Sequence, residues 1–125
     1  MNNKWLKLIL VNLVFAICIH GMAQFPEVKS DLDKKVYAFL TEQSGEWQDM
    51  NVPVSDGRIL YDLVIQGKYK KALEIGTSTG HSAIWIAWAL SKTGGKLVTI
   101  EIEKQRYLQA MRNFRKAGLF SYIDA

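Results

Sequence analysis

A short strand, a loop of small residues and a helix are expected to follow one another directly between Lys71 and Leu90. The apolar run KALEI ends at Ile75, the loop GTSTGH comes next, and the run SAIWIAWAL follows. The last run is long and rich in Ala and Trp, which favours a helix over a second strand. The β-branched run KLVTIEI, residues 96–102, then predicts another strand. This order predicts parallel strands joined by a right-handed crossover.

Two helices are expected before the first strand, separated by a loop over residues 41–53. Ser30 is a suitable N-cap for the first, 30–40, and Ser55 is expected to cap the second, 56–68, which ends near Gly67. Apolar residues recur at helical spacing in both segments. The residues that fall on one apolar face are Leu32, Val36, Phe39 and Leu40 in the first helix, and Ile59, Leu60, Leu63 and Val64 in the second.

An amphipathic helix is expected over residues 103–118, with Gly118 as its stop, and YIDA at 122–125 begins a further strand. The inward residues of this helix are expected to be Tyr107, Leu108, Met111 and Phe114. The sequence therefore predicts an α/β fold with a Rossmann-like, doubly wound, mostly parallel sheet. Because the pattern stops after the second β-α unit, we expect a truncated sheet, the N-terminal half of a larger domain.

The first 23 residues have the pattern of a secretory signal peptide. Lys4 and Lys7 precede a run over 8–19 that is apolar except for one Asn, and Gly21 and Ala23 suit a cleavage site. Export to the periplasm or the medium is therefore expected. The alternative is a membrane anchor through residues 5–20, although the run is short for the roughly 20 residues that span a bilayer.

Residues 24–125 would form the folded domain after cleavage. Cys18 is the only cysteine of the chain, so the domain would contain neither a disulfide nor a thiolate ligand. His81 would be its only histidine, which leaves little basis for a zinc site. A net charge of +4, reduced by the loss of two lysines, does not indicate a nucleic-acid partner.

The loop after the first strand is suited to a ligand, since ligands bind beyond the carboxyl ends of strands in open parallel sheets. Gly76 and Gly80 allow a tight turn and close approach of the backbone. The helix that begins near Ser82 offers free N–H groups to a carboxylate or phosphate. Glu101 ends the second strand, twenty-five positions after Gly76, where an acid typically binds two ribose hydroxyls.

The glycine spacing and the preceding acid distinguish between ribose-bearing cofactors. A dinucleotide-binding loop reads G-x-G-x-x-G, whereas here Ser78 stands where the middle glycine would be. Glu74 at the strand's tip would repel a pyrophosphate and suit an ammonium group. S-adenosylmethionine carries an amino group, a carboxylate and a ribose but no phosphate, so it fits this arrangement best.

Three blocks of the sequence resemble class I S-adenosylmethionine-dependent O-methyltransferases of the catechol and caffeoyl-CoA type. They are MNVPVSDGRIL, LEIGTSTGHSAIWIAWAL and GGKLVTIEIEKQRYLQAMRNFRKAG, which together cover most of residues 50–118. The resemblance implies a methyltransferase fold of which this chain is the first half. It also implies transfer of a methyl group to a hydroxyl of a small, catechol-like or phenolic acceptor, and a homodimer.

The same resemblance implies roles for individual residues. Met50 would lie near the acceptor, and His81 departs from the tyrosine that is usual at its position. The implied cofactor-binding residues are Val52, Glu74, Gly76, Thr77, Ser78, Gly80, Ser82, Glu101 and Ile102. A divalent cation, usually magnesium, would hold the acceptor hydroxyl. Its ligands and the catalytic base are expected on later strands, so neither is assigned here.

Two other functions stay open at this point: a nicotinamide-dependent Rossmann-type oxidoreductase, and an inert truncated product. Trp85 and Trp88 are expected to pack in the core, since they share a helix with alanines. The basic residues of 103–118 are expected to form a solvated helix face, which gives no reason to propose a nucleic-acid partner.

Overall fold

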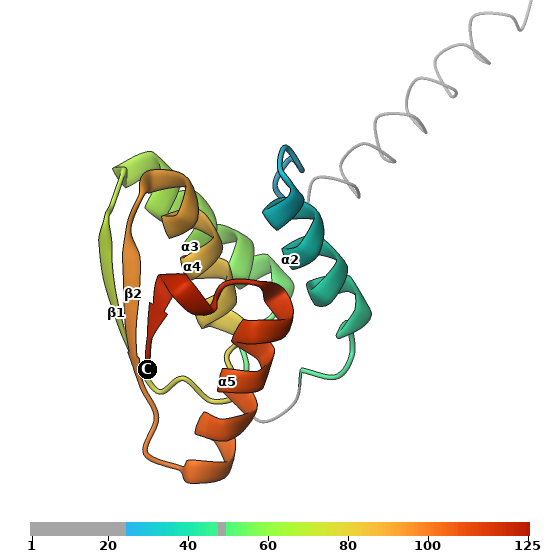
Figure 1. Ribbon diagram of the computed structural model, residues 1–125, viewed down its shortest axis with the longest axis vertical. Coiled ribbons are helices and arrows are strands. Elements are labelled where there is room, and N and C mark those ends of the chain that lie inside the picture. Colours follow the sequence, from blue (N-terminus) through green and yellow to red (C-terminus); the bar gives the residue numbers. More distant parts are fainter. Residues whose placement is uncertain (1–24, 48–49) are drawn as a thin grey trace, which may run out of the picture.

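Parallel strands form one layer of the molecule and helices cover one face of it (Figure 1). The computed structural model describes residues 25–47 and 50–125. Its elements are α2 (Asp31–Glu42), α3 (Val54–Gly67), β1 (Lys71–Ile75), α4 (His81–Thr93), β2 (Lys96–Ile100), α5 (Lys104–Ala117), the 3-10 turn η1 (Phe120–Tyr122) and β3 (Ile123–Asp124). The expected signal peptide or anchor, residues 1–23, lies outside the described residues. Among residues 25–47 and 50–125, none of the helices has the length and hydropathy of a membrane span.

The sheet has the order β1-β2-β3, and both pairs of neighbouring strands are parallel. Leu73 pairs with Val98, and Leu97 pairs with Ile123. The α/β fold with parallel strands is therefore confirmed. β2 ends at Ile100, two residues earlier than predicted, so Glu101 lies beyond the strand.

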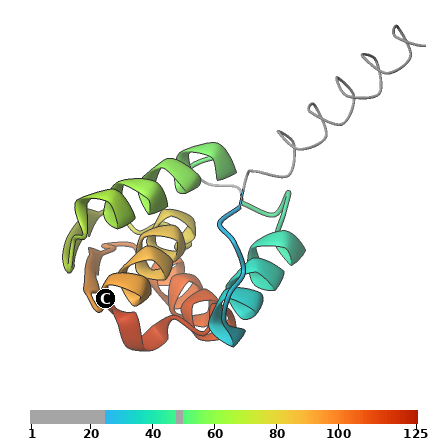
Figure 2. The ribbon, with the colours of Figure 1, turned by 90° about the horizontal axis from the view of Figure 1, so that it is seen from above.

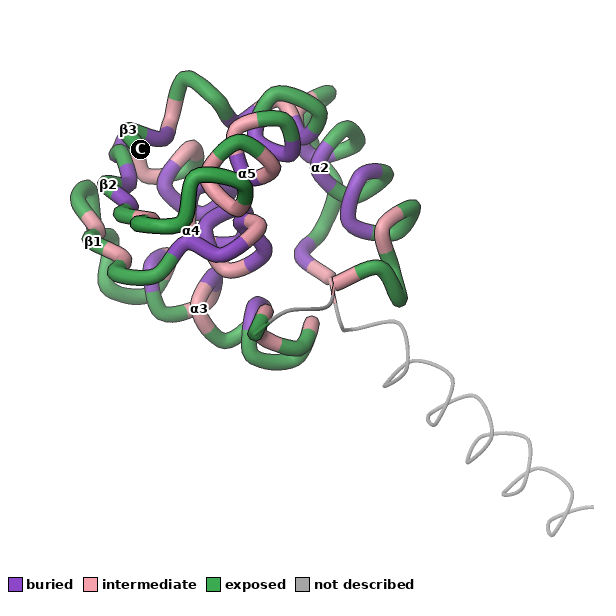
Figure 3. Tube along the Cα trace, turned by 90° about the horizontal axis from the view of Figure 1, so that it is seen from below, coloured by how far each residue is buried: buried purple, intermediate pink, exposed green. Residues whose placement is uncertain are grey.

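The two faces of the sheet differ in their cover (Figure 3). Leu97 and Thr99 of β2 are buried on the face toward the helices. The opposite face carries exposed apolar side chains, Leu73, Ile75, Val98 and Ile100, together with the exposed charged residues Lys71, Lys96 and Asp124. In the described part of the chain, the sheet is thus covered on one side, as expected for the first half of a doubly wound domain.

Helix α4 forms the centre of the core. Ile84, Trp85, Trp88 and Leu90 are fully buried, so the expectation that both tryptophans pack in the core is confirmed. α3 lies alongside α4 (Figure 2). A Cβ atom on Gly57 would lie 2.3 Å from Cδ1 of Trp85, so only glycine allows α3 to lie this close.

Helix α2 is attached to α4 through one buried carboxylate. Asp33 belongs to a capping box with Ser30 and is fully buried. Its Oδ1 accepts a hydrogen bond of 2.7 Å from Nε1 of Trp88 and pairs with the ammonium group of Lys92. Burial alone would raise the pKa of Asp33, but the hydrogen bonds from Lys92, Trp88 and Ser30 hold that pKa well below its usual range.

The expected cap of the second helix is wrong. Pro53 is the N-cap, and its carbonyl accepts from the backbone N–H groups of Asp56 and Gly57. Ser55 lies inside the first turn, and its hydroxyl donates to the Asp56 carboxylate. The helix begins earlier because proline has the extended backbone that an N-cap requires and cannot itself donate.

The expected inward face of α5 is wrong at Leu108, which is exposed, and the apolar face of α3 is not buried at Ile59 and Leu63. α3 instead buries Gly57, Tyr61 and Val64, and α5 buries Ala110, Asn113, Phe114 and Ala117. Close contacts with α4 determine which face of α3 is buried. They include an edge-to-face contact between the rings of Tyr61 and Trp88, whose centroids are 5.3 Å apart. Apolar periodicity does not detect such contacts.

Candidate functional site

The loop between β1 and α4 is fixed to the end of β2. The backbone N–H groups of Gly76 and Thr77 both donate to the carbonyl of Ile100, over 2.9 and 3.2 Å. Asn113 of α5 donates from its side chain to the carbonyl of Thr79 over 2.9 Å. The loop is therefore held from β2 and from α5, which fixes its shape before any ligand arrives.

Glu74 accepts a hydrogen bond on each carboxylate oxygen. The Ser82 hydroxyl donates to Oε1 over 2.5 Å, and the Thr99 hydroxyl donates to Oε2 over 2.7 Å. The Thr99 hydroxyl uses its proton in this bond. In the 2.5 Å contact between the Thr77 and Thr99 hydroxyls, Thr77 therefore donates and the Thr99 oxygen accepts. Burial raises the pKa of Glu74, although both hydroxyl bonds favour the ionised form.

Glu101 bridges the end of β2 and the loop. Its carboxylate accepts from the backbone N–H of Glu103 over 2.9 Å and from that of Ser78 over 2.7 Å. The bond from Glu103 is the main cause that lowers the pKa of Glu101. Glu101 is thus an ionised, partly exposed acceptor at the carboxyl end of the sheet, which suits a pair of hydroxyl donors.

Gly76 and Gly80 have left-handed backbone angles, with φ of 91° and 99°. A Cβ atom on Gly80 would lie 2.6 Å from the Phe114 ring, so this glycine allows the loop to pack on α5. A Cβ atom on Gly76 would meet open space. Gly76 is therefore the point where the backbone of the loop faces solvent and a ligand can approach. Ser78 shares the left-handed region, with φ of 50°, a conformation that costs a non-glycine residue about 1 kcal/mol.

The segment before α3 lies against the same loop. The side chain of Asn51 donates to the Thr79 hydroxyl over 2.8 Å, and the carbonyl of Val52 lies 2.7 Å from Nδ1 of His81. Val52 is half-buried, and Met50 is 89% exposed. Residues about thirty positions apart in the sequence therefore meet at the start of α4.

The structure brings most of the predicted cofactor residues together at one edge of the sheet. Ile102 extends away from the described residues and is 97% exposed. Sequence reasoning missed Asn51, Thr99 and Asn113, which hold the loop in place. The available signals were a threonine within the apolar run of β2 and an asparagine on the buried side of α5.

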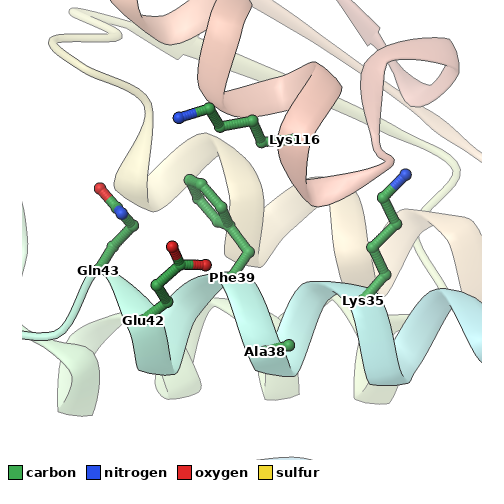
Figure 4. Close-up of a pocket in the computed structure, with 6 residues that line it drawn as sticks. All are labelled: Lys35, Ala38, Phe39, Glu42, Gln43 and Lys116. Carbon is green, nitrogen blue, oxygen red and sulfur yellow. The ribbon is translucent and has the colours of Figure 1, made fainter.

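A pocket of about 370 Å³ lies elsewhere, between α2 and α5 (Figure 4). Five of its six lining residues lie on or directly after α2, and Lys116 lies on α5. None of the six belongs to the loop 76–80 or to the ends of β1 and β2. This pocket is therefore not the predicted cofactor site.

The comparisons with known proteins agree with this geometry. The O-methyltransferase family model matches residues 27–125. A catechol O-methyltransferase from Niastella koreensis is 36% identical over 75 residues, which are 60% of this chain and 34% of the relative. A caffeoyl-CoA O-methyltransferase from Populus kitakamiensis is 31% identical over 106 residues, which are 85% of this chain and 44% of the relative.

A solved structure supports the same assignment. The O-methyltransferase TomG from Streptomyces achromogenes, in complex with S-adenosylmethionine, superposes with a TM-score of 0.62 at 28% identity. The match covers 86% of this chain and 46% of TomG. The chain thus spans less than half the length of these relatives. With the family model matched over nearly all of the described residues, the chain belongs to the O-methyltransferase family.

Proposed function

We propose that this chain supplies the cofactor-binding half of an S-adenosylmethionine-dependent O-methyltransferase. The observation that carries the proposal is the pair of carboxylates, Glu74 and Glu101, at the carboxyl ends of two adjacent parallel strands. The loop 76–80 lies between them and presents the open side of Gly76. Family membership, and relatives named for catechol and caffeoyl-CoA methylation, support the same conclusion.

In the proposed binding mode, each part of the cofactor has a partner of opposite polarity. Glu74 attracts the ammonium group, and its burial strengthens that attraction. The first turn of α4, with Ser82, donates N–H groups to the carboxylate. Glu101 accepts from the two ribose hydroxyls, and Val52 and Ile102 contribute apolar contacts.

The reaction that we propose is direct methyl transfer. The acceptor hydroxyl oxygen forms a bond to the methyl carbon, the carbon–sulfur bond breaks, and its electron pair goes to sulfur. The hydroxyl proton leaves to a base. The sulfonium is already activated, so the protein's task is to align the reactants and exclude water. Met50 is proposed to face the acceptor, which we expect to be a small phenol or catechol.

A divalent cation, expected to be magnesium, would lower the pKa of the acceptor hydroxyl. In the ranges 25–47 and 50–125, no group of three or more His, Cys, Asp or Glu residues could hold a metal ion. The resemblance implies that the ligands and the catalytic base lie on later strands, so neither is assigned to a residue of this chain. A homodimer is likewise proposed from the resemblance alone, and light scattering of the purified protein would test it.

Export remains a proposal that rests on the pattern of residues 1–23. We propose cleavage before Gln24, and the alternative is a tether through residues 5–20. Mass spectrometry of the mature N-terminus, in membrane and soluble fractions of the expressing cells, distinguishes the two. A chain that begins at Met1 in the soluble fraction would contradict both.

Binding calorimetry on the 125-residue chain tests the proposed function. S-adenosylhomocysteine should bind, and NAD should not compete with it. Binding of NAD alone would favour the oxidoreductase, and a chain that binds neither ligand and unfolds without a cooperative transition would favour the inert product. Glu101→Ala should weaken binding, whereas Glu103→Gln, at the neighbouring acid, should leave it unchanged.

A further inference from the structure

His81 lies at the start of α4 and is almost completely buried, with 1% of its surface exposed. Nδ1 of its ring lies 2.7 Å from the Val52 carbonyl, and Nε2 lies 3.1 Å from Nε1 of Trp85. The Trp47 ring stacks on the imidazole at a centroid distance of 4.3 Å and an angle of 13°. Both ring nitrogens and one face of the ring are therefore engaged.

These contacts determine which nitrogen carries the proton. The indole N–H of Trp85 can only donate, so Nε2 of His81 must accept. The Val52 carbonyl can only accept, so Nδ1 must carry the proton and donate it. The imidazole is thus neutral in a single tautomer. Burial lowers the pKa of His81, opposed by the bond to Val52, which agrees with a neutral ring at pH 7.

We propose that His81 is a positioning residue that holds the Asn51–Val52 segment against the cofactor loop through its Nδ1–H bond to the Val52 carbonyl. This inference rests on the proposed function for its consequence, because Val52 is a proposed cofactor contact. The hydrogen bond itself is independent of any ligand.

Further contacts show why one bond can position the segment. Pro53 follows Val52 and restricts it to extended conformations, so few backbone states remain to be selected. The Asn51 side chain donates to Thr79 over 2.8 Å and stands 3.4 Å from the backbone N–H of His81. Met50 next to them has a left-handed φ of 64° and no such support from His81. The side-chain bond from His81 therefore acts on Val52, while Asn51 next to it is held by its own side-chain bonds.

The test compares two replacements of similar size. His81→Asn places an amide N–H close to where Nδ1–H stands, whereas His81→Leu removes the donor. Imidazole nitrogen shifts and the Val52 carbonyl carbon shift, measured by NMR on the full chain, report the bond. Calorimetry with S-adenosylhomocysteine reports its consequence.

We expect an Nδ1–H tautomer for His81, and a Val52 carbonyl shift that moves in His81→Leu and returns toward the wild-type value in His81→Asn. The affinity should fall about tenfold in His81→Leu, the loss of about one hydrogen bond to a ligand-positioning group, and recover in His81→Asn. An Nε2–H tautomer, or an unmoved Val52 shift in His81→Leu, would overturn the proposal.

Equal affinities of wild type, His81→Leu and His81→Asn would also overturn it, leaving His81 a packing residue. Should His81→Leu fail to fold, the tautomer of the wild type and the affinity of His81→Asn still decide. A wild-type chain that binds no S-adenosylhomocysteine would overturn the proposed function and the effect on affinity. The NMR measurements would then decide the hydrogen bond separately.

Discussion

The Ser82 hydroxyl lies 2.5 Å from Oε1 of Glu74 and joins the first turn of α4 to the end of β1. Thr99 makes the matching bond to Oε2 from β2. The carboxylate is therefore shared by three elements, β1, β2 and α4, that meet at the carboxyl ends of the strands. Its two bonded hydroxyls keep it in place and leave a second lone pair on each oxygen.

Removal of the Ser82 hydroxyl should raise the pKa of Glu74 further. The bond from Ser82 lowers that pKa against the larger effect of burial. In Ser82→Ala the carboxylate would be stabilised by Thr99 alone. Carbon-detected NMR titration of Glu74 measures the change, with Ser91→Ala, at the other end of α4, as the control. An unchanged or lower pKa in Ser82→Ala would contradict the geometry.

Affinity for S-adenosylhomocysteine should decrease as the pH falls. An ammonium group needs an ionised partner, and burial raises the pKa of Glu74 above its ordinary value of 4.5. Protonation, and with it the loss of affinity, should therefore begin above pH 4.5. Glu74→Gln should bind more weakly at pH 7, by about tenfold, and lose this pH dependence. Calorimetry between pH 5 and pH 8 provides the measurement, and an identical pH profile in Glu74→Gln would refute the assignment.

Asp33→Ala should destabilise the fold by about 3 kcal/mol, because it leaves Lys92 and Trp88 without their buried partner. Asp31→Ala is the matched control, since Asp31 pairs with Lys34 on the exposed side of the same turn, and such a pair contributes about 0.5 kcal/mol. Urea unfolding followed by tryptophan fluorescence gives both values. Equal losses in the two variants would argue against the buried link.

The same carboxylate predicts how acid affects stability. Hydrogen bonds hold the pKa of Asp33 below its ordinary value of 3.8, so the unfolded chain takes up a proton first as the pH falls. The stabilisation is complete above pH 3.8 and decreases below it. Thermal unfolding of wild type and Asp33→Ala should therefore converge toward low pH, and a constant difference would contradict this.

The bare face of the sheet should cause self-association. Leu73 is 65% exposed on that face and belongs to β1, an edge strand of the described sheet. Its apolar side chain and the unpaired backbone groups of β1 both favour contact with another chain. Leu73→Lys should reduce association in sedimentation velocity experiments. Ile59→Lys is the control, at a residue that is 58% exposed on a helix. An equal effect of both changes would point to general solubility.

The sequence was sufficient for the order of elements because each has a local signal. Ser30 and Gly118 mark helix ends, and the apolar runs 71–75 and 96–100 have the length of strands. The positions of the loop 76–80, Glu74 and Glu101 at the carboxyl ends of two adjacent strands were also predictable, since the strand and helix signals around them place them there. Which face of α3 and of α5 is buried was not predictable. Contacts between elements that are distant in the sequence determine how each helix is turned about its axis.

The supporting residues of the site were harder to predict for a related reason. Asn113 and Thr99 act through hydrogen bonds to atoms 34 and 25 positions away in sequence. The sequence marks His81 as the only histidine of residues 24–125 and as a departure from a tyrosine, but its bond to Val52 depends on a loop that no local pattern places. Long-range hydrogen bonds of this kind become visible only when the chain is folded.

The contact between Gly57 and Trp85 has a consequence for how these sequences can diverge. The indole ring fills the space that any side chain at position 57 would need, since a Cβ there would lie 2.3 Å from it. A larger residue at 57 would be tolerated only beside a smaller one at 85. Across evolution, the two positions should therefore covary, although they lie 28 positions apart in the sequence and neither is proposed to touch the cofactor.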